Sequence, residues 1–488
     1  VTHDATLAGS GTPADPLTVL ESGGGGTVHP DQQIMFWEAY FEYWDCVNAT
    51  NCAPQINWAD TSDQYWARAV GGGSNDYGHT LIPTSDGGYA MGGFSQTYSN
   101  YYLLTKFSTN GAASWSRTIN YGSGSYQYFR GLAQTSDNGY ITTGSYSTTQ
   151  YIILVKLNSM GNLVWGRYFY SYSTSGNNVG YQVIEASDGD YVVFGTTYDY
   201  ESASGDYPDE DFLMAKFNSS GTLQWARIVD YSPGATYDYD YCCSGVQASD
   251  GGFVMAGYYS NYLHLIKLDA SGNLVWAKRI QGYNSTNYPC NIIRTSDNGY
   301  AVAITTTTFG AGSEEFLLLK FASDGSLQWA RTAGGASSEF NPSVIQTNDG
   351  GYALFGQTIS FGAGGYDFLL VKFDASGSYL WAKTYGGASN EQTTYGGPNI
   401  FQNAEGFFTM GGYTDSYGAG GVDYFHVRAG ANGDCCFGET APVGISAPTP
   451  TTSDITASVV VADPSLSIWN LTPNMNTPAP TAEQVCGP

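Results

Sequence analysis

One short phrase recurs six times along the chain, and it constrains the fold more strongly than any other feature. It reads KLDASGNLVWAKRI at residues 267–280. The other five copies begin at Lys106, Lys156, Lys216, Lys320 and Lys372. Each copy is an apolar run, a turn rich in Gly, Ser, Asp or Asn, and a second run that carries a Trp. Because Asp supplies side-chain turn bonds and Gly accepts positive φ, the phrase predicts a β-hairpin.

A second phrase precedes each of these hairpins and ends in its own apolar run, as in SDGGYAMGGF up to Phe94. Its aromatic anchors, 47 to 62 residues apart, are Tyr89, Tyr140, Tyr191, Phe253, Tyr300, Tyr352 and Phe407. Each unit therefore parses into four short strands. A period near 50 residues with strand-only content is typical of a β-propeller, in which each unit is one blade.

The number of blades follows from one missing strand. The seventh unit reads FHVRAGANGDCC and has no Trp strand, whereas an unassigned Trp strand, YWARAVGG, lies at residues 65–72 before the first unit. We predict that the strand of Trp66 completes the last blade and closes the ring, which removes two sheet edges. The sequence thus predicts an all-β, seven-bladed propeller of four-stranded blades over residues 61–434.

Most of the cations occupy two repeat positions. One is filled by Lys106, Lys156, Lys216, Lys267, Lys320, Lys372 and Arg428, and the other by Arg68, Arg117, Arg167, Arg227, Lys278, Arg331 and Lys383. These are 14 of the 17 Lys and Arg residues. They either form a ring that binds an anion, or pair with turn aspartates and cover aromatic faces with their stems. A position filled in every blade favours the structural interpretation.

The repeat resembles two kinds of known propeller. KLDASGNLVWAKR has the spacing of the Trp-docking repeat of quinoprotein (PQQ) propellers, and the SDGGY…K.D..G.L.W.K unit resembles repeats of secreted bacterial and archaeal β-propeller surface proteins. The quinoprotein resemblance would place a cofactor beside the vicinal pair Cys242-Cys243. However, those enzymes typically have eight blades, and no acidic cluster here matches their Ca²⁺ and catalytic carboxylate. We therefore expect no cofactor and no enzyme.

The segments outside the ring differ in composition. Residues 1–27 are a strand-like arm and Gly linker, and HDATLAGSGTPADPLTVL resembles β-segments of phage tail fibres. Within residues 28–60, the stretch 30–45 predicts one short helix with its aromatic residues on one face. Residues 435–488 form an extended Pro/Thr-rich tail with short strands, and residues 454–463 alternate in hydrophobicity.

An arm on a Gly tether beside a tail with strand alternation suggests strand donation between copies. The residues expected at this contact are Leu7, Leu17, Val19, Ile455, Val459 and Val461. Our leading hypothesis is an extracellular structural protein whose terminal segments join copies into a homo-oligomer, fibre or surface array. The alternative is a secreted or cell-surface module that binds glycans or proteins, and a secreted propeller enzyme is a less favoured third hypothesis.

Composition restricts the partners and favours secretion. A net charge of −26 repels nucleic acid and anionic membranes, and no stretch is apolar enough to span a bilayer. Few charged residues and many Tyr, Gly, Ser and Thr favour a secreted β-rich protein. The even number of cysteines points the same way, so we predict disulfides at Cys46, Cys52, Cys242, Cys243, Cys290, Cys435, Cys436 and Cys486. Cys46 with Cys52 is the only pairing that the sequence indicates.

No group of residues indicates a catalytic or metal site. His264 and His426 lie within predicted strands, where a packed imidazole is the simpler reading. Asp209, Glu210 and Asp211, and Asp238 with Asp240, either hold Ca²⁺ or are solvated loop acids. Long Tyr-rich loops suit the stacking of sugars, or pack on neighbours. N-glycosylation sequons begin at Asn48, Asn218, Asn284 and Asn470.

Overall fold

The computed structural model describes residues 65–435 except for 98–100, 121–126, 147–150, 171–177, 200–208, 231–239, 260–261, 282–289, 311–312, 395–397 and 419–420, and it describes nine short strands outside that range. The chain divides into two compact units, Val1–Thr61 and Ser62–Pro488. In the first unit, β1 (Thr6–Ala8) pairs antiparallel with β2 (Thr18–Leu20), with Leu7 opposite Val19. The predicted helix at 30–45 lies outside the described residues.

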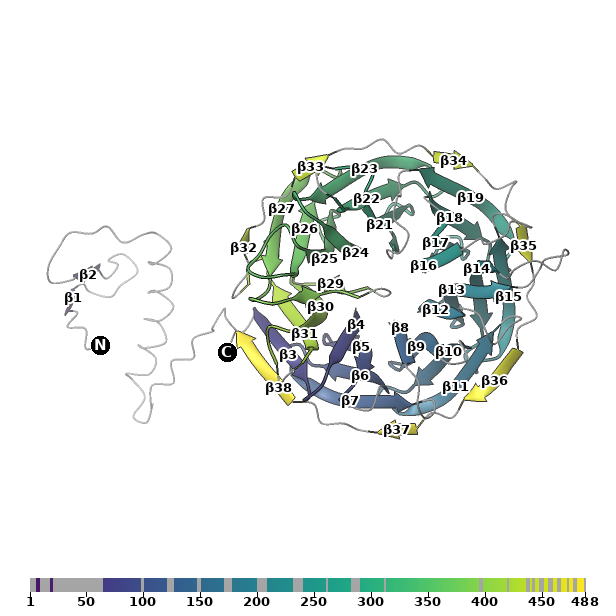
Figure 1. Cartoon of the computed structure of the whole chain (residues 1–488), viewed down its shortest axis with the longest axis horizontal. Helices are drawn as coiled ribbons and strands as arrows, with labels where there is room; N and C mark the ends of the chain where they lie inside the picture. Colours follow the sequence, from purple (N-terminus) through teal and green to yellow (C-terminus); the bar gives the residue numbers. More distant parts are fainter. Residues whose placement is uncertain are drawn as a thin grey trace. The chain divides into compact units, whose positions relative to one another are not determined.

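The second unit is a ring of seven antiparallel blades, as predicted (Figure 1). Blade 1 consists of β4 (Asp76–Pro83), β5 (Tyr89–Ser95), β6 (Tyr101–Phe107) and β7 (Ala113–Asn120). Blade 2 consists of β8 (Gln127–Gln134), β9 (Tyr140–Tyr146), β10 (Tyr151–Leu157) and β11 (Leu163–Tyr170). Blade 3 consists of β12 (Val179–Glu185), β13 (Tyr191–Asp199), β14 (Asp209–Phe217) and β15 (Leu223–Asp230). The first strand of each blade is innermost.

The remaining blades repeat this order. Blade 4 consists of β16 (Asp240–Gln247), β17 (Phe253–Tyr259), β18 (Tyr262–Leu268) and β19 (Leu274–Gln281). Blade 5 consists of β20 (Asn291–Arg294), β21 (Tyr300–Thr306), β22 (Glu315–Phe321) and β23 (Leu327–Gly334). Blade 6 consists of β24 (Glu339–Gln346), β25 (Tyr352–Thr358), β26 (Asp367–Phe373) and β27 (Tyr379–Tyr385). In blade 7, β28 (Glu391–Gln392) and β29 (Ile400–Gln402) both pair with β30 (Phe408–Thr414), which pairs with β31 (Asp423–Ala429).

The closure of the ring is confirmed. β3 (Trp66–Gly71) pairs antiparallel with β31, with Trp66 opposite Arg428, and so supplies the fourth strand of blade 7. Trp66 is only 1% exposed and stacks on Tyr89 of blade 1 at 5.9 Å between ring centroids. Residues more than 300 positions apart in sequence are thus joined in one sheet.

The same aromatic contact recurs at every junction between blades. The Trp of each outer strand packs on the first aromatic residue in the second strand of the next blade, at 5.4–6.3 Å. At the last junction the partner of Trp381 is Phe408 and not the expected Phe407, whose ring instead lies under the Arg428 guanidinium. The middle strands of each blade are buried on both faces, so the core lies between the blades.

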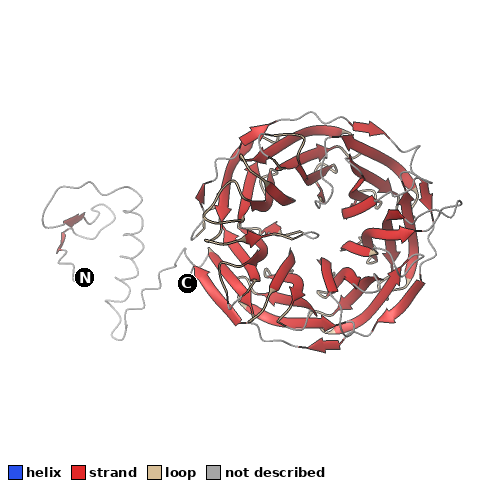
Figure 2. Cartoon of the chain, viewed as in Figure 1, coloured by secondary structure: helices blue, strands red, loops and turns tan. Residues whose placement is uncertain are grey.

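The C-terminal tail adds a fifth strand to every blade, which sequence analysis did not predict. It runs around the outside of the ring in the reverse order of the blades (Figures 1 and 2). Its strands pair as follows: β32 (Glu439–Thr440) with β27, β33 (Gly444–Ser446) with β23, β34 (Thr452–Asp454) with β19, β35 (Val460–Ala462) with β15, β36 (Ser467–Leu471) with β11, β37 (Asn474–Asn476) with β7 and β38 (Thr481–Cys486) with β3.

One of the three tail residues singled out for assembly is placed by the structure. Val461 lies in β35, opposite Val229 of blade 3 of its own chain. Ile455 and Val459 lie outside the described residues. Among the parts of the chain that are described, no helix is long and apolar enough to cross a membrane.

Candidate functional site

The two ends of each blade carry different chemistry. At one end, tight turns join the first strand to the second and the third to the fourth, and we call this the turn end. At the other end lie the loops between second and third strands and the connections between blades, which we call the loop end. Each functional side chain is placed below by its position relative to these two ends.

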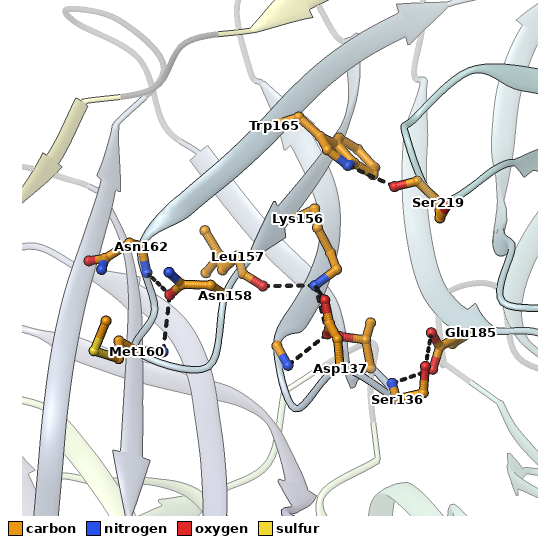
Figure 3. A network of polar contacts seen from close by, with 12 residues as sticks. Ser136, Asp137, Lys156, Leu157, Asn158, Met160, Asn162, Trp165, Glu185 and Ser219 are labelled. Atoms are coloured by element: carbon orange, nitrogen blue, oxygen red, sulfur yellow. Dashed lines mark hydrogen bonds and ion pairs between the residues drawn. The ribbon is translucent and has the colours of Figure 1, made fainter.

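At the turn end, a buried lysine meets an exposed aspartate in six blades. The pairs are Lys106–Asp86, Lys156–Asp137, Lys216–Asp188, Lys267–Asp250, Lys320–Asp297 and Lys372–Asp349, at 2.5–2.9 Å between nitrogen and oxygen. In blade 7, Arg428 and Glu405 take these places. Figure 3 shows that the ammonium of Lys156 also donates to the Leu157 carbonyl oxygen at 3.0 Å. The lysines are therefore structural cations of each blade.

These pairs alter the acidity of the turn carboxyls. Partial burial would raise the pKa of Asp137, but hydrogen bonds from Lys156 and Thr135 outweigh it and lower that pKa to about 2. The pKa values of Asp297 and Asp349 are lowered to about 2 by the same combination. The turn aspartates are consequently ionised at any physiological pH.

The second set of cations ties neighbouring blades together. Arg68, Arg167, Arg227 and Arg331 each donate from Nε to a carbonyl oxygen in the last turn of the next blade, at 2.8–3.2 Å. Their guanidinium groups also lie over the Trp of the same strand. This arrangement confirms the structural interpretation of the two cation positions. Three cations remain outside it: Arg130, Arg279 and Arg294.

At the loop end, buried carboxylates take the place of cations. Glu339 and Glu391 begin β24 and β28, are 0% exposed, and accept hydrogen bonds from the backbone N–H of Gly335 and Gly387 at 2.9 and 2.6 Å. Asp76 accepts from Gly72 in the same way at 2.9 Å. Burial raises the pKa of all three carboxyls despite these hydrogen bonds.

A second buried carboxylate approaches the first at each of these junctions. A Cβ on Gly386 would lie 1.8 Å from Asp367 Oδ1 and 2.4 Å from Glu391 Oε2, so only glycine fits between the two acids. Four acids at or near the start of third strands are all at most 5% exposed: Asp211, Glu315, Asp367 and Asp423. Within the described residues no three His, Cys, Asp or Glu side chains gather as a metal site would require.

One position in the innermost strands carries different chemistry from blade to blade. Counting five residues back from the first residue of each inner turn gives His79, Arg130, Tyr181, Cys243, Cys290, Pro342 and Pro398. We call these seven residues the bulge ring, because the first four are the extra residues of β-bulges in β4, β8, β12 and β16. A further bulge in β24 contains Asn341 and Pro342. Bulges redirect side chains and are frequent beside functional sites.

Neighbouring members of the bulge ring interact from blade to blade. His79 Nδ1 lies 2.7 Å from the Phe129 carbonyl oxygen, and the charge of Arg130 acts on the imidazole. The Arg130 guanidinium lies 5.5 Å from the ring of Tyr128 and 5.8 Å from that of Tyr181. Besides burial, the thiol of Cys243 helps to raise the pKa of Tyr181 and the pKa of the Cys290 thiol. An imidazole, a guanidinium, a phenol and two thiols therefore follow one another across five blades.

The residues that follow three members of the bulge ring, Tyr181, Cys243 and Cys290, connect adjacent inner strands. Gln182 Oε1 accepts from the Ser244 hydroxyl at 2.5 Å and from the Gly245 N–H at 3.0 Å. Ser244 Oγ accepts from the Ile292 N–H at 3.3 Å, and Asn291 Oδ1 accepts from the Val344 N–H at 3.0 Å. These bonds hold the inner strands of blades 3 to 6 at a defined spacing, which orients the bulge ring.

Burial keeps most of these groups uncharged. It lowers the pKa of His79 to about 4, with help from the charge of Arg130, and it raises the pKa of the Cys290 thiol. Burial likewise raises the pKa of Tyr181. Arg130 is the permanent charge in the bulge ring, and it gives this arc the chemistry to attract an anion.

The bulge ring was missed by sequence analysis, although a signal was present. Arg130 was one of the three cations left over from the two repeat positions, and the position five residues before the inner turn holds five residue types in seven blades. Of the expected histidines, His264 is 1% and His426 0% exposed, and burial lowers both pKa values to about 3, so packed imidazoles are confirmed. His3 and His29 lie outside the described residues.

The predicted disulfides and sequons have mixed outcomes. Cys242, Cys243, Cys290 and Cys435 are free thiols in this structure, so a disulfide at these four positions is not seen. Cys46, Cys52 and Cys436 lie outside the described residues, and Cys486 ends β38. The Asn218 amide oxygen accepts from the backbone of Ser220 and Thr222 within its turn. Asn470 lies in β36, and Asn48 and Asn284 are outside the described residues.

Comparisons with known proteins give only distant structural likenesses. No protein-family model matches the chain, and no curated protein matches it. It resembles the solved structures of Drosophila plexin A in complex with semaphorin 1b (TM-score 0.40, 9% identity, 75% of this chain and 87% of that chain) and of the NanB sialidase from Streptococcus pneumoniae (0.34, 14%, 78% and 58%). It also resembles a putative gluconolactonase (0.34, 12%, 75% and 92%). The expected membership of a secreted surface-protein family stays a prediction.

One expectation is corrected by these comparisons. We expected the chain not to be an enzyme, but the solved structures that resemble it include a sialidase, a putative gluconolactonase and a puromycin hydrolase. Their fold accommodates catalysis, so the exclusion does not stand. At these identities and TM-scores the likeness concerns the fold alone and transfers no activity to this chain.

Proposed function

We propose that this protein is the structural subunit of an extracellular assembly, in which the C-terminal tail clasps the rim of the propeller and exchanges between copies. The observation that carries the proposal is the pairing of seven tail strands with the outermost strands of all seven blades. Extracellular location is supported by the composition and by the acidic, lysine-poor surface that a net charge of −26 implies.

Without the tail, the rim of the propeller would expose strand edges that can pair with strands of other chains. The fourth strand of a blade leaves one row of N–H and C=O groups unpaired, and such edges recruit strands from other chains. The tail covers each edge with a short strand, from two residues in β32 to six in β38. Because every segment is short, each is held by few hydrogen bonds, and the tail can be displaced blade by blade.

The rim also offers nearly equivalent acceptors. The outer strands of blades 3 to 6 read LQWARIV, LVWAKRI, LQWARTA and YLWAKTY, so their edges are similar. Strand addition relies on main-chain hydrogen bonds, which do not depend on side-chain identity. A tail released by one copy therefore finds matching edges on another copy. Such head-to-tail exchange builds a fibre if it does not close.

Engineered cysteines test this exchange. Arg279 is exposed at the rim and lies opposite Ser453 of β34. One variant carries Arg279→Cys and another carries Ser453→Cys, and the two are mixed, assembled and oxidised. We expect disulfide-linked dimers on a non-reducing gel, because the tail of one copy then lies on the rim of the other.

The matched control replaces Ser453→Cys with Ser467→Cys, since Ser467 lies opposite Tyr170 in blade 2 and not opposite Arg279. This control mixture should give no dimers. A double variant with both Arg279→Cys and Ser453→Cys reports on pairing within one copy. Tail exchange is wrong if the double variant crosslinks within single chains while the mixture shows only the monomer band on the non-reducing gel. This comparison is made at protein concentrations at which assemblies form.

A second candidate is an extracellular binding module, and one observation favours it. Arg130 lies between two tyrosine rings on the innermost strands, a place suited to an acidic ligand such as a carboxylate-bearing sugar. The crosslinking experiment separates the candidates, because a binding module of this kind does not need its tail to leave the rim.

A further inference from the structure

Two thiols from adjacent blades meet in the interior. Cys243 is the bulge residue of β16 in blade 4, and Cys290 directly precedes β20 in blade 5. They are 3% and 2% exposed, and besides burial the neighbouring thiol of Cys243 helps to raise the pKa of the Cys290 thiol. Both belong to one apolar cluster at the junction of blades 4 and 5, together with Tyr258 and Ile292.

The bulge separates Cys243 from its sequence neighbour Cys242. Cys242 packs in the cluster between blades 3 and 4, where its N–H donates to Thr196 Oγ1 at 3.0 Å and its thiol lies 3.9 Å from the Ala256 carbonyl oxygen. Cys243 packs in the cluster on the other side of the blade. The partner of Cys243 is therefore the distant Cys290 and not the adjacent cysteine.

The backbone around the two thiols is held at a spacing that a crosslink needs. Ser244, next to Cys243, accepts a hydrogen bond from the N–H of Ile292, which lies two residues after Cys290. Ser244 is also bonded to Gln182 of blade 3. A disulfide requires two Cα atoms within about 7 Å of each other. The hydrogen bond between Ser244 and Ile292 ties the backbone of β20 to the residue next to Cys243.

We propose that Cys243 and Cys290 form an interblade disulfide in the mature protein. The oxidant is a small-molecule disulfide such as oxidised glutathione. One thiolate attacks it, forms a mixed disulfide and releases one glutathione thiolate, and the second cysteine thiolate then attacks the mixed disulfide and releases the other. The two cysteine thiols lose two protons and two electrons, and two molecules of reduced glutathione are formed. This crosslink does not depend on tail exchange, and neither result decides the other.

The timing of the reaction follows from burial. Thiol–disulfide exchange needs a thiolate that the oxidant can reach, and both thiols are enclosed once blades 4 and 5 have packed. The bond therefore forms during folding, before the junction closes. A folded, reduced molecule should resist oxidation, and a folded, oxidised one should resist reducing agents until it unfolds.

Refolding the full chain in a mixture of oxidised and reduced glutathione tests the proposal. Proteolysis without reduction, followed by mass spectrometry, should give a peptide pair linked through Cys243 and Cys290. The oxidised protein should melt about 5 °C above the reduced protein, since the crosslink closes a long loop. Cys290→Ser should abolish the linked peptides and this difference, whereas the matched variant Cys242→Ser should retain both.

The identification of linked peptides in the unmodified chain tests the proposal even if a variant fails to fold. Recovery of Cys243 and Cys290 as free thiols after refolding in the oxidising mixture, with other cysteines linked, would overturn the proposal. A peptide linked through Cys242 and Cys243 would overturn it equally, because the bulge would then not separate these neighbours.

Discussion

The turn end of most blades is built from charged pairs of lysine and aspartate, whereas the loop end contains buried carboxyl groups whose neutral form is favoured. At the turn end, six buried lysines hold exposed aspartates ionised, and the arrangement is nearly the same in each blade. At the loop end, buried acids such as Glu339 and Glu391 accept backbone hydrogen bonds, and burial favours their protonated forms. The inner strands between these ends carry the varied bulge ring.

The repeated contacts hold the ring together, whereas the bulge ring distinguishes this propeller from others. The Trp–aromatic contact occurs at all seven junctions between blades, so its residue types must suit the packing of any two blades. A bulge-ring residue such as Arg130, which occurs in one blade alone, does not have to meet this requirement. We therefore expect large losses of stability at the turn end, and effects on binding or chemistry at the bulge ring.

The largest effect is expected where the turn end closes the ring. Trp66→Ala removes a fully buried ring that contacts Tyr89 and His426, and it should lower the free energy of unfolding by about 3–5 kcal/mol. Tyr151→Ala is the matched change at the loop end, where the ring is half-buried and stacks on Tyr168 and Tyr170, and about 1 kcal/mol is expected. Urea denaturation measures both, and equal losses would break the distinction between the ends.

A smaller effect is expected for one lysine–aspartate pair. Asp137→Ala leaves the Lys156 ammonium enclosed without its carboxylate, which should cost about 1–3 kcal/mol, less than for a fully buried pair because Asp137 is exposed. Adding Lys156→Met should restore most of the loss, since no buried charge remains. A double-mutant cycle measures this coupling. Additive losses would show that the pair is not a unit.

The smallest effect concerns pH, and it has opposite signs at the two ends. Each turn aspartate has a folded pKa below its unfolded value near 4, so its stabilisation is present above pH 4 and is lost as pH falls toward about 2. At the loop end, Asp76, Glu339 and Glu391 have raised folded pKa values, so their stabilisation is present below about pH 4 and is lost as pH rises through the folded pKa.

Thermal unfolding against pH should therefore give a maximum on the acidic side of neutrality. Glu339→Gln should melt slightly higher than the natural protein at pH 7 and equally at pH 4, because the amide retains hydrogen-bonding capacity without a buried charge. Asp137→Asn should lower the curve at every pH above about 4, where the Asp137 carboxylate stabilises the folded protein, and should leave it unchanged near pH 2. A Glu339→Gln curve parallel to that of the natural protein would contradict the raised pKa.

The sequence by itself determined the ring. Tight hairpins need Gly, Asn or Asp at set positions, and the stacked blades here share an aromatic contact at each junction. The repeated sequence phrases therefore indicate both the hairpins and the stacking of the blades. The missing seventh Trp strand and the early Trp66 strand showed how the circle closes. The two cation positions were also interpreted correctly, because a residue that recurs with each blade serves the blade.

Only the tertiary structure decided the course of the tail and the identity of the bulge ring. Tail strands pair through backbone groups, which have no side-chain pattern, so alternation around Val461 indicated a strand but not its partner Val229. A β-bulge places one extra residue in one strand of a pair, so it can be identified only when the register of the two strands is known. For that reason Cys242 and Cys243, adjacent in the chain, face different blade junctions, and Cys243 meets Cys290.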